Sequence, residues 1–161
     1  MAIQAVVVIL VLLLVFSVVG EYLRLQIIAK GVRDAVQSAV ISVATGNYDD
    51  VYNGLREGYS GGYALYGDDW LTQVDQGAVM NELSILLGLS FGQKYTDGQL
   101  EYEITDMNLN VINAPFAPMS NSDRFESEVY LTLTVPTAFG WERIPPMVIE
   151  MKVEAGYTPK F

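Results

Sequence analysis

The chain has 161 residues, with 19 acidic against 9 basic side chains, a net charge near −10, and neither Cys nor His. The missing Cys and His remove the usual ligands for zinc, iron, copper and haem, and they exclude cysteine nucleophiles and Ser-His-Asp triads. An acidic chain is poorly suited to nucleic acid, whose phosphates attract Lys and Arg. We therefore expect no enzyme activity, no cofactor and no nucleic-acid partner.

Residues 2–20 form an apolar run, AIQAVVVILVLLLVFSVVG, in which only Gln4 and Ser17 are polar. Its length is close to the roughly 20 residues with which a helix crosses a bilayer core. The run is longer than the apolar core of a signal peptide, about 7–15 residues, and lacks a basic start, so a cleaved signal peptide is the less favoured alternative. A helix that is apolar on every side must be enclosed by lipid or protein, including neighbouring copies. The run predicts a transmembrane or filament-core helix.

The helix is predicted to continue to Thr45, because residues 21–45 contain no Pro and become amphipathic. Their apolar side chains recur in steps of three and four, the period of one helix face. This face consists of Leu25, Ile28, Val32, Ala35, Ala39 and Val43, widened by Val36 and Val40. A helix of about 44 residues is roughly 66 Å long, so its second half must pack on the head or on another subunit. Gly20 and Gly31 predict either a bend near Gly20 or close helix packing.

The chain thus divides into residues 1–46, the long helix, and residues 47–161, an acidic globular head. Short helices are expected within 47–90: one capped by Asp49 or Asp50, then an ordered Gly-Tyr loop over 58–67, and a second from Asp75 to Leu87. The buried face of the second helix is expected to contain Val79, Leu83, Leu86 and Leu87, with Ala78 and Ile85 beside them.

Residues 91–161 are expected to form an antiparallel sheet, because three stretches alternate apolar and polar side chains. The apolar sets are Leu100, Tyr102 and Ile104, shifting to Met107, Leu109 and Val111; then Phe125, Val129, Leu131, Leu133 and Val135; and then Met147, Ile149, Met151 and Val153. The shift of parity predicts a bulge near Asp106, and Asp97-Gly98 predicts a hairpin turn. The apolar side of the sheet needs a cover, for which the amphipathic half of the long helix is the obvious candidate.

Oxygen ligands for calcium occur together in the stretch SNSDRFESE, which contains Asn121, Asp123, Glu126 and Glu128. The stretch lacks the spacing and the Gly of an EF-hand, so a calcium site is a weak alternative and no metal is expected. The adjacent carboxylates Asp49-Asp50 and Asp68-Asp69 are typical of turns.

The predicted fold is α+β: a long N-terminal helix, apolar and then amphipathic, packed on a C-terminal antiparallel sheet. This layout, carried mainly by residues 2–45, resembles type IV pilin-like proteins, including the TadE-like pilins of the Tad type. In that family the apolar helix halves bundle into the core of a filament, and the heads face solvent. Ala5 stands where family members typically have Glu, and Gly20 is the nearest substitute for their helix-breaking Pro.

The resemblance implies a structural subunit of an extracellular type IV pilus-like filament, located at the cell surface and anchored in the membrane before assembly. The implied partners are copies of itself in a helical filament, the membrane and the pilus assembly machinery. The helix-bundle contacts are predicted at Val8, Leu12, Val15, Val19, Glu21, Arg24, Ile28 and Val32. The alternative is a monomeric, single-pass membrane-anchored surface binding module, or a component of a secretion or pilus assembly machine.

The orientation of the head depends on what precedes the apolar run. Arg24, Lys30 and Arg33 follow the run and no base comes before it, so the positive-inside rule alone places the head in the cytoplasm. A basic leader removed before Met1, as in pilin-like precursors, would reverse this orientation. An extracellular head is therefore expected together with such a leader.

Overall fold

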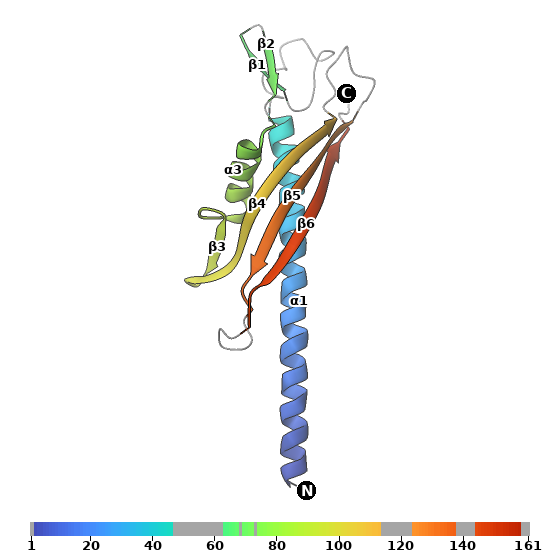
Figure 1. Cartoon of the computed structure of the whole chain (residues 1–161), viewed down its shortest axis with the longest axis vertical. Helices are drawn as coiled ribbons and strands as arrows, with labels where there is room; N and C mark the ends of the chain where they lie inside the picture. The colour runs from blue at the N-terminus through green and yellow to red at the C-terminus, as the bar shows by residue number, and fades with distance from the viewer. Residues whose placement is uncertain are drawn as a thin grey trace.

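The computed structural model describes residues 2–46, 63–67, 69–72, 74–113, 124–137 and 144–158. One long helix, α1 (Ala2–Thr45), projects by its first half from a head made of a single main sheet and a second helix (Figure 1). The predicted α+β architecture is confirmed, with α1 lying against an antiparallel sheet formed by the C-terminal part of the chain.

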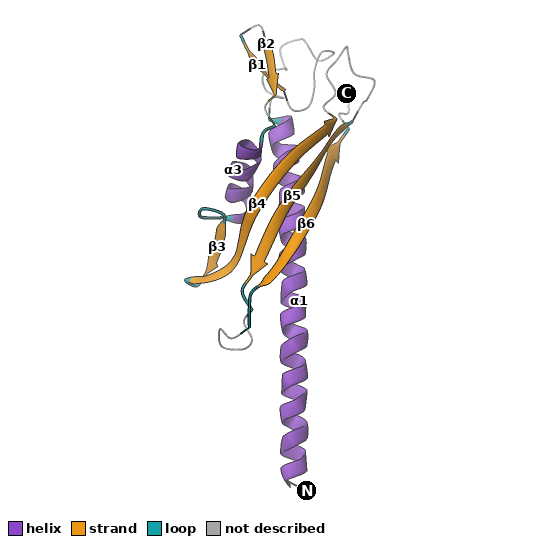
Figure 2. Cartoon of the chain, viewed as in Figure 1, coloured by secondary structure: helices purple, strands orange, loops and turns teal. Residues whose placement is uncertain are grey.

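The main sheet has four antiparallel strands in the order in which they occur in the chain. They are β3 (Gln93–Thr96), β4 (Gln99–Asn113), β5 (Phe125–Val135) and β6 (Met147–Tyr157). α1 and the second helix, α3 (Gln76–Leu87), lie on the same face of this sheet (Figure 2). A separate hairpin, which the sequence did not predict, pairs β1 (Tyr63–Tyr66) with β2 (Asp69–Thr72).

The helix α1 runs without interruption through both of its glycines, so the bend considered near Gly20 does not occur. A Cβ added at Gly20 or at Gly31 would meet nothing within 4 Å, so neither glycine serves close packing within this chain. The backbone N–H of Gly46 donates to the carbonyl oxygen of Val43, 3.3 Å away, directly after the last helical residue. The helix therefore ends where the sequence predicts.

The core lies between the second half of α1 and the inner face of the sheet. The helix contributes Leu25, Ile28, Val32, Val36, Ala39, Val40 and Ala44. In β5 the alternation is complete, because every second side chain from Phe125 to Val135 is buried. The period of 3.6 residues in a helix and of 2 in a strand gives each element one apolar face, and the two faces meet here. The predicted cover of the sheet is confirmed.

Helix α3 has the predicted ends. The Asp75 carboxylate accepts a hydrogen bond from the backbone N–H of Ala78 at 2.7 Å, and Gly88 closes the helix in the left-handed conformation. Val79 and Leu83 are buried as expected, whereas Leu86 is about half exposed, which corrects its predicted place in the buried face. Leu86 has nearly the same helical phase as Val79, seven residues earlier, so its exposure follows from its place in the last turn of α3 and not from the face on which it lies.

Two local irregularities predicted in the sheet are present. Asp106 has φ 52°, and the β4–β5 register shifts between Thr105 and Asn108, which is the expected bulge. Asp97 and Gly98 both have positive φ in the two-residue turn between β3 and β4, the geometry of a primed hairpin turn.

Two predictions in the N-terminal part of the head fall wholly or partly outside the described residues. The helix capped by Asp49 or Asp50 lies entirely outside them. The Gly-Tyr loop lies outside them over 58–62, and its remainder is corrected, because Tyr63–Tyr66 forms strand β1. The pairing of β1 with β2 supplies the backbone hydrogen bonds that a loop would lack.

Hydrogen bonds hold the sheet at a defined height along the long helix. Arg24 Nη1 donates to the carbonyl oxygen of Pro136 at 3.3 Å, near the start of the amphipathic half. Gln37 Nε2 donates to the carbonyl oxygen of Glu154 at 2.8 Å, about three and a half turns further along the helix. The end of the sheet where β5 stops and β6 begins therefore lies beside residue 24, next to the projecting half of α1 (Figure 1).

Candidate functional site

The most unusual surface of this chain is the first half of α1. From Ile3 to Val19 the large apolar side chains are about half exposed or more, which is what a helix with no neighbour shows. The helix is long and apolar enough to cross a membrane, a criterion that a signal sequence near the N-terminus also meets. Soluble monomers rarely expose more than a few hundred Å² of contiguous apolar surface, so we expect either lipid or another protein surface to cover this segment.

The free energy at stake in covering this surface is large. Fully burying a Val, Leu, Ile or Phe side chain is worth roughly 1.5–3 kcal/mol, so each half-exposed residue retains about 1 kcal/mol. Over the whole segment this amounts to on the order of 10 kcal/mol, comparable with the stability of a small domain. Covering the helix is therefore worth about as much free energy as folding a small domain.

The structure divides the eight predicted bundle residues into two groups. Four of them, Val8, Leu12, Val15 and Val19, lie on the projecting half and are 48–57% exposed. Their spacing of four, three and four residues places them on one helix face, where a neighbouring helix can reach them. Ile28 and Val32 are instead buried in the core of their own chain, so their surface is already occupied.

The remaining two predicted residues, Glu21 and Arg24, pair with each other at the boundary between the two halves of α1. Arg24 Nη1 lies 3.1 Å from Glu21 Oε1, with the Glu21 side chain 17% exposed and the Arg24 side chain 33% exposed. The same Nη1 atom donates to the Pro136 carbonyl oxygen. Of the two pairings considered, within one helix or between neighbours, this single chain forms the first, and the pair also joins α1 to the sheet.

The outer face of the sheet carries a second feature, a polar network centred on Lys152. Its Nζ atom lies 2.8 Å from Glu128 Oε1 and 3.2 Å from Glu154 Oε1, and the Tyr130 hydroxyl donates to Glu128 Oε2 at 2.8 Å. The hydrogen bonds from Lys152 and Tyr130 lower the pKa of the Glu128 carboxyl, and the bonds to Glu128 and Glu154 raise the pKa of Lys152. The two carboxylates, the ammonium group and the hydroxyl thus bind one another.

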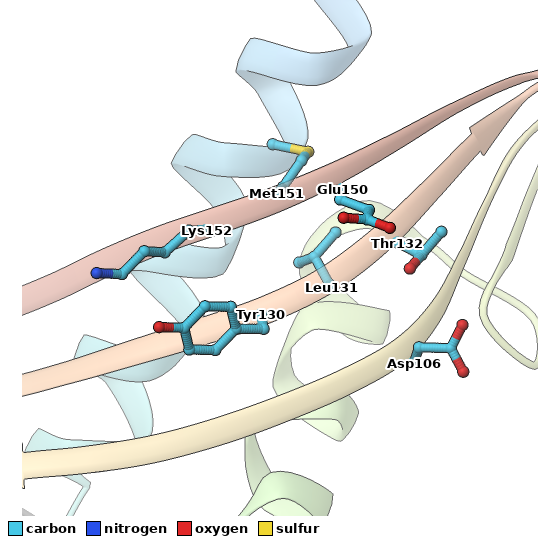
Figure 3. Close-up of a pocket in the computed structure, with 7 residues that line it drawn as sticks. All are labelled: Asp106, Tyr130, Leu131, Thr132, Glu150, Met151 and Lys152. Atoms are coloured by element: carbon cyan, nitrogen blue, oxygen red, sulfur yellow. The ribbon is translucent and has the colours of Figure 1, made fainter.

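Beside this network lies a shallow hollow of 370 Å³, shown in Figure 3. It is lined by Asp106, Tyr130, Leu131, Thr132, Glu150, Met151 and Lys152. The lining side chains in the picture stand along three neighbouring strands, with Tyr130 and Lys152 toward one end and Asp106 toward the other. The lining therefore combines one aromatic ring with hydrogen-bonding and charged groups.

Within the described ranges, no three Asp or Glu side chains come together as a metal site. Of the four candidate calcium ligands, Asn121 and Asp123 lie outside the described residues. Glu126 and Glu128 form ion pairs with Arg124 and Lys152. The calcium stretch therefore stays untested as a unit.

Three features of the surface were missed by the sequence analysis. Met147 begins β6 in the predicted apolar register but is 44% exposed, because the buried side chains of β6 begin only at Met151. Lys30 and Arg33 of α1 line a groove with β6 residues 149–152, a juxtaposition that no local pattern signals. Phe91 is fully exposed with φ 51°, and nothing in the structure explains this position.

Comparison with known proteins gave no relative of this chain. No family model matches the chain, and neither the curated proteins nor the solved structures contain a match.

Proposed function

We propose that this chain is a structural subunit of an extracellular, type IV pilus-like filament. The observation that carries the proposal is the division of one continuous helix into two halves with different neighbours. The second half is the core of an acidic head, whereas the first half has no neighbour within the described chain. Such a subunit is anchored in the membrane by the apolar half, and assembly machinery transfers that half into a bundle of identical helices.

The charge distribution supports the same function. The head is strongly acidic, which favours solubility and disfavours unspecific association of heads. Cohesion then comes from the apolar helices, at about 25 cal/mol per Å² removed from water. A filament with acidic heads outside and apolar helices inside would place each of these two surfaces in the environment that suits it.

The first test places a charge on the projecting helix. Val8→Asp is expected to abolish filaments in negative-stain images of sheared surface material, because an unpaired carboxylate in an apolar bundle costs several kcal/mol. Ile112→Asp is the matched control, since Ile112 is equally exposed but lies on the head, 55% against 57% for Val8. Filaments of normal abundance from Val8→Asp would contradict the proposal.

A second pair of variants separates assembly from anchoring. Val8→Ala/Leu12→Ala keeps the helix apolar, so its insertion into lipid is preserved, but it removes packing atoms from one helix face. Leu10→Ala/Leu14→Ala removes similar volume from the opposite face. We expect both proteins in the membrane fraction and weaker filaments for the first. Equal filament loss would instead indicate that the helix is enclosed on all sides.

A monomeric, membrane-anchored binding module is the second candidate, favoured by the hollow on the outer face of the sheet (Figure 3). It shares the anchor and the head but needs no self-association, and it suits a component of a secretion or assembly machine. Two observations on the unsubstituted protein at normal abundance would favour this function over the filament. The protein would be a single chain in detergent, and sheared surface material would contain no fibres.

A further inference from the structure

The end of the head nearest the projecting helix carries apolar side chains that the core does not use. Ile144, Met147 and Val148 are 43%, 44% and 60% exposed, and Pro145 and Pro146 between them are also exposed. The carbonyl oxygen of Ile144 accepts a hydrogen bond from Thr137 Oγ1 at 3.3 Å, which holds this stretch at the end of the sheet. We call Ile144, Met147 and Val148 the rim.

The rim stands at a defined height on the helix. Met147 pairs with Val135 in the β5–β6 ladder, and the next residue of β5, Pro136, accepts the hydrogen bond from Arg24. Residue 24 is four residues beyond Gly20, where the apolar run ends, or about 6 Å along the axis at 1.5 Å per residue. A headgroup layer is roughly 5–8 Å thick on each side of the hydrocarbon core. With residues 2–20 in the hydrocarbon, the rim lies in the headgroup layer.

Aromatic and apolar side chains of α1 indicate the same level independently. Tyr22 is 60% exposed two residues beyond the run, and its hydroxyl accepts a hydrogen bond from Gln26 Nε2 at 2.8 Å. Tyr is enriched at the boundary between membrane and water, where its ring and its hydroxyl meet different phases. Leu23 and Ile27 are also exposed at this level.

Two basic side chains of α1 lie near the rim. Lys30 and Arg33 are exposed and line the groove between α1 and β6, and among the residues that the structure describes neither forms an ion pair or a side-chain hydrogen bond. Asp34 and Glu150 line the same groove. Side chains of a helix lean toward its N-terminus, here toward the rim. Lys30 and Arg33 stand about 9 and 14 Å beyond residue 24 along the helix axis, at 1.5 Å per residue. The lean of their side chains brings the charges nearer to the headgroup layer, to a separation on the order of one Debye length, roughly 8 Å.

We propose that the rim and these two cations form a second membrane contact, which seats the head on a bilayer surface that carries anionic lipid. This inference rests on the anchoring part of the proposed function and is independent of filament formation. The apolar rim enters the headgroup layer, while Lys30 and Arg33 attract lipid phosphates to an otherwise acidic head. The contact holds the head against the membrane before assembly and must be released when the subunit leaves the bilayer.

The experiment uses the full chain in nanodiscs that hold one copy each, with nitroxide-labelled lipid as a quencher. Because the chain has no Cys, a single introduced Cys can be labelled with an environment-sensitive fluorophore. Val148→Cys reports on the rim, Leu12→Cys on the anchor, and Ile112→Cys is a control of similar exposure near the opposite end of the sheet. Circular dichroism establishes that each labelled variant is folded, and Met147→Cys replaces Val148→Cys if the latter is not.

We expect quenching and a blue shift at positions 12 and 148, with position 112 unchanged. Quenching at 148 is expected to be stronger in phosphatidylcholine discs that contain phosphatidylglycerol than in discs that lack it. Lys30→Gln/Arg33→Gln should remove this difference, whereas Asn108→Asp/Asn110→Asp, which changes the net charge equally on the outer face of the sheet, should retain it.

The possible failures are distinguishable. Quenching at 12 without quenching at 148 overturns the rim contact and leaves the anchor in place. No quenching at 12 overturns the anchoring on which the inference rests. A signal at 148 that appears only when several copies share one disc assigns the rim to contact between copies, and this also overturns the proposal.

Discussion

The side-chain amide of Gln37 donates a hydrogen bond to the carbonyl oxygen of Glu154 across 2.8 Å. This bond joins the long helix to β6, one of the two edge strands of the main sheet. An edge strand presents unpaired backbone groups that invite further strands, and a neighbouring helix is one way to cover them. The helix that projects from the head thus also lies beside the β6 edge of the sheet.

Loss of this bond should weaken the head measurably. Gln37→Ala is expected to lower the free energy of unfolding by about 1 kcal/mol, the net worth of a typical hydrogen bond. Chemical denaturation of the full chain in detergent measures the change. Ser38→Ala, which removes only a bond from Ser38 Oγ to a carbonyl oxygen of its own helix, is the control. Equal midpoints for Gln37→Ala and the unsubstituted chain would contradict the role assigned to Gln37.

The two leucines of α3 should respond very differently to truncation. Leu83 is fully buried whereas Leu86 is about half exposed, on the same helix and three residues apart. Leu83→Ala is expected to cost about 2–5 kcal/mol, because it leaves a cavity in the core. Leu86→Ala should cost well under 1 kcal/mol. Comparable losses, measured by thermal denaturation of the full chain, would show that Leu86 belongs to the core after all.

Two glycines should respond in opposite directions to the same substitution. Gly31→Ala is expected to stabilise the head by up to about 1 kcal/mol, because Gly31 is helical and an added Cβ meets nothing within 4 Å. Gly92→Ala should destabilise it, because Gly92 has φ 83° and an added Cβ would lie 2.9 Å from the Ile104 carbonyl oxygen. The difference in denaturation midpoint between the two variants measures both effects, and a reversed order would contradict them.

The pair formed by Glu128 and Lys152 gives the head a pH-dependent component of stability. The pKa of Glu128 is lowered from its ordinary value of 4.5, chiefly by the hydrogen bond from Lys152. A lowered carboxyl pKa contributes stability that is present above 4.5 and is lost as the pH falls through the folded-state pKa. The pKa of Lys152 is raised, so its contribution is lost only at high pH, above its ordinary value of 10.5.

Glu128→Gln should therefore be less stable than the unsubstituted chain at pH 6, and the gap should narrow at pH 3. The effect will be small and sensitive to salt, because the pair lies on the surface. Denaturation midpoints at both pH values, in low and in high salt, measure it. A gap that widens on acidification would contradict the assigned direction of the shift.

Several local features could be read from the sequence because their causes are local. The Asp75 cap and the Gly88 end of α3 follow from side-chain and backbone preferences at helix termini. The Asp97-Gly98 turn and the bulge at Asp106 follow from residues that tolerate positive φ and from a break in the period-two alternation. The long helix follows from an apolar run without Pro, and its apolar stripe correctly identified most of the side chains that cover the sheet.

Other features depend on which surfaces meet in space, and local pattern cannot supply that information. Met147 continues the apolar alternation of β6 yet is 44% exposed, because burial depends on where the helix lies relative to the end of the sheet. Ile28 and Val32, like Val8 and Leu12, are apolar side chains four residues apart on the same long helix, but only tertiary packing places the first two inside the head and leaves the others uncovered. The composition and order of residues thus determined an apolar helix joined to an acidic α+β head. The tertiary structure decided which part of the helix surface the chain covers itself, because burial is a property of two surfaces in contact and not of either surface alone.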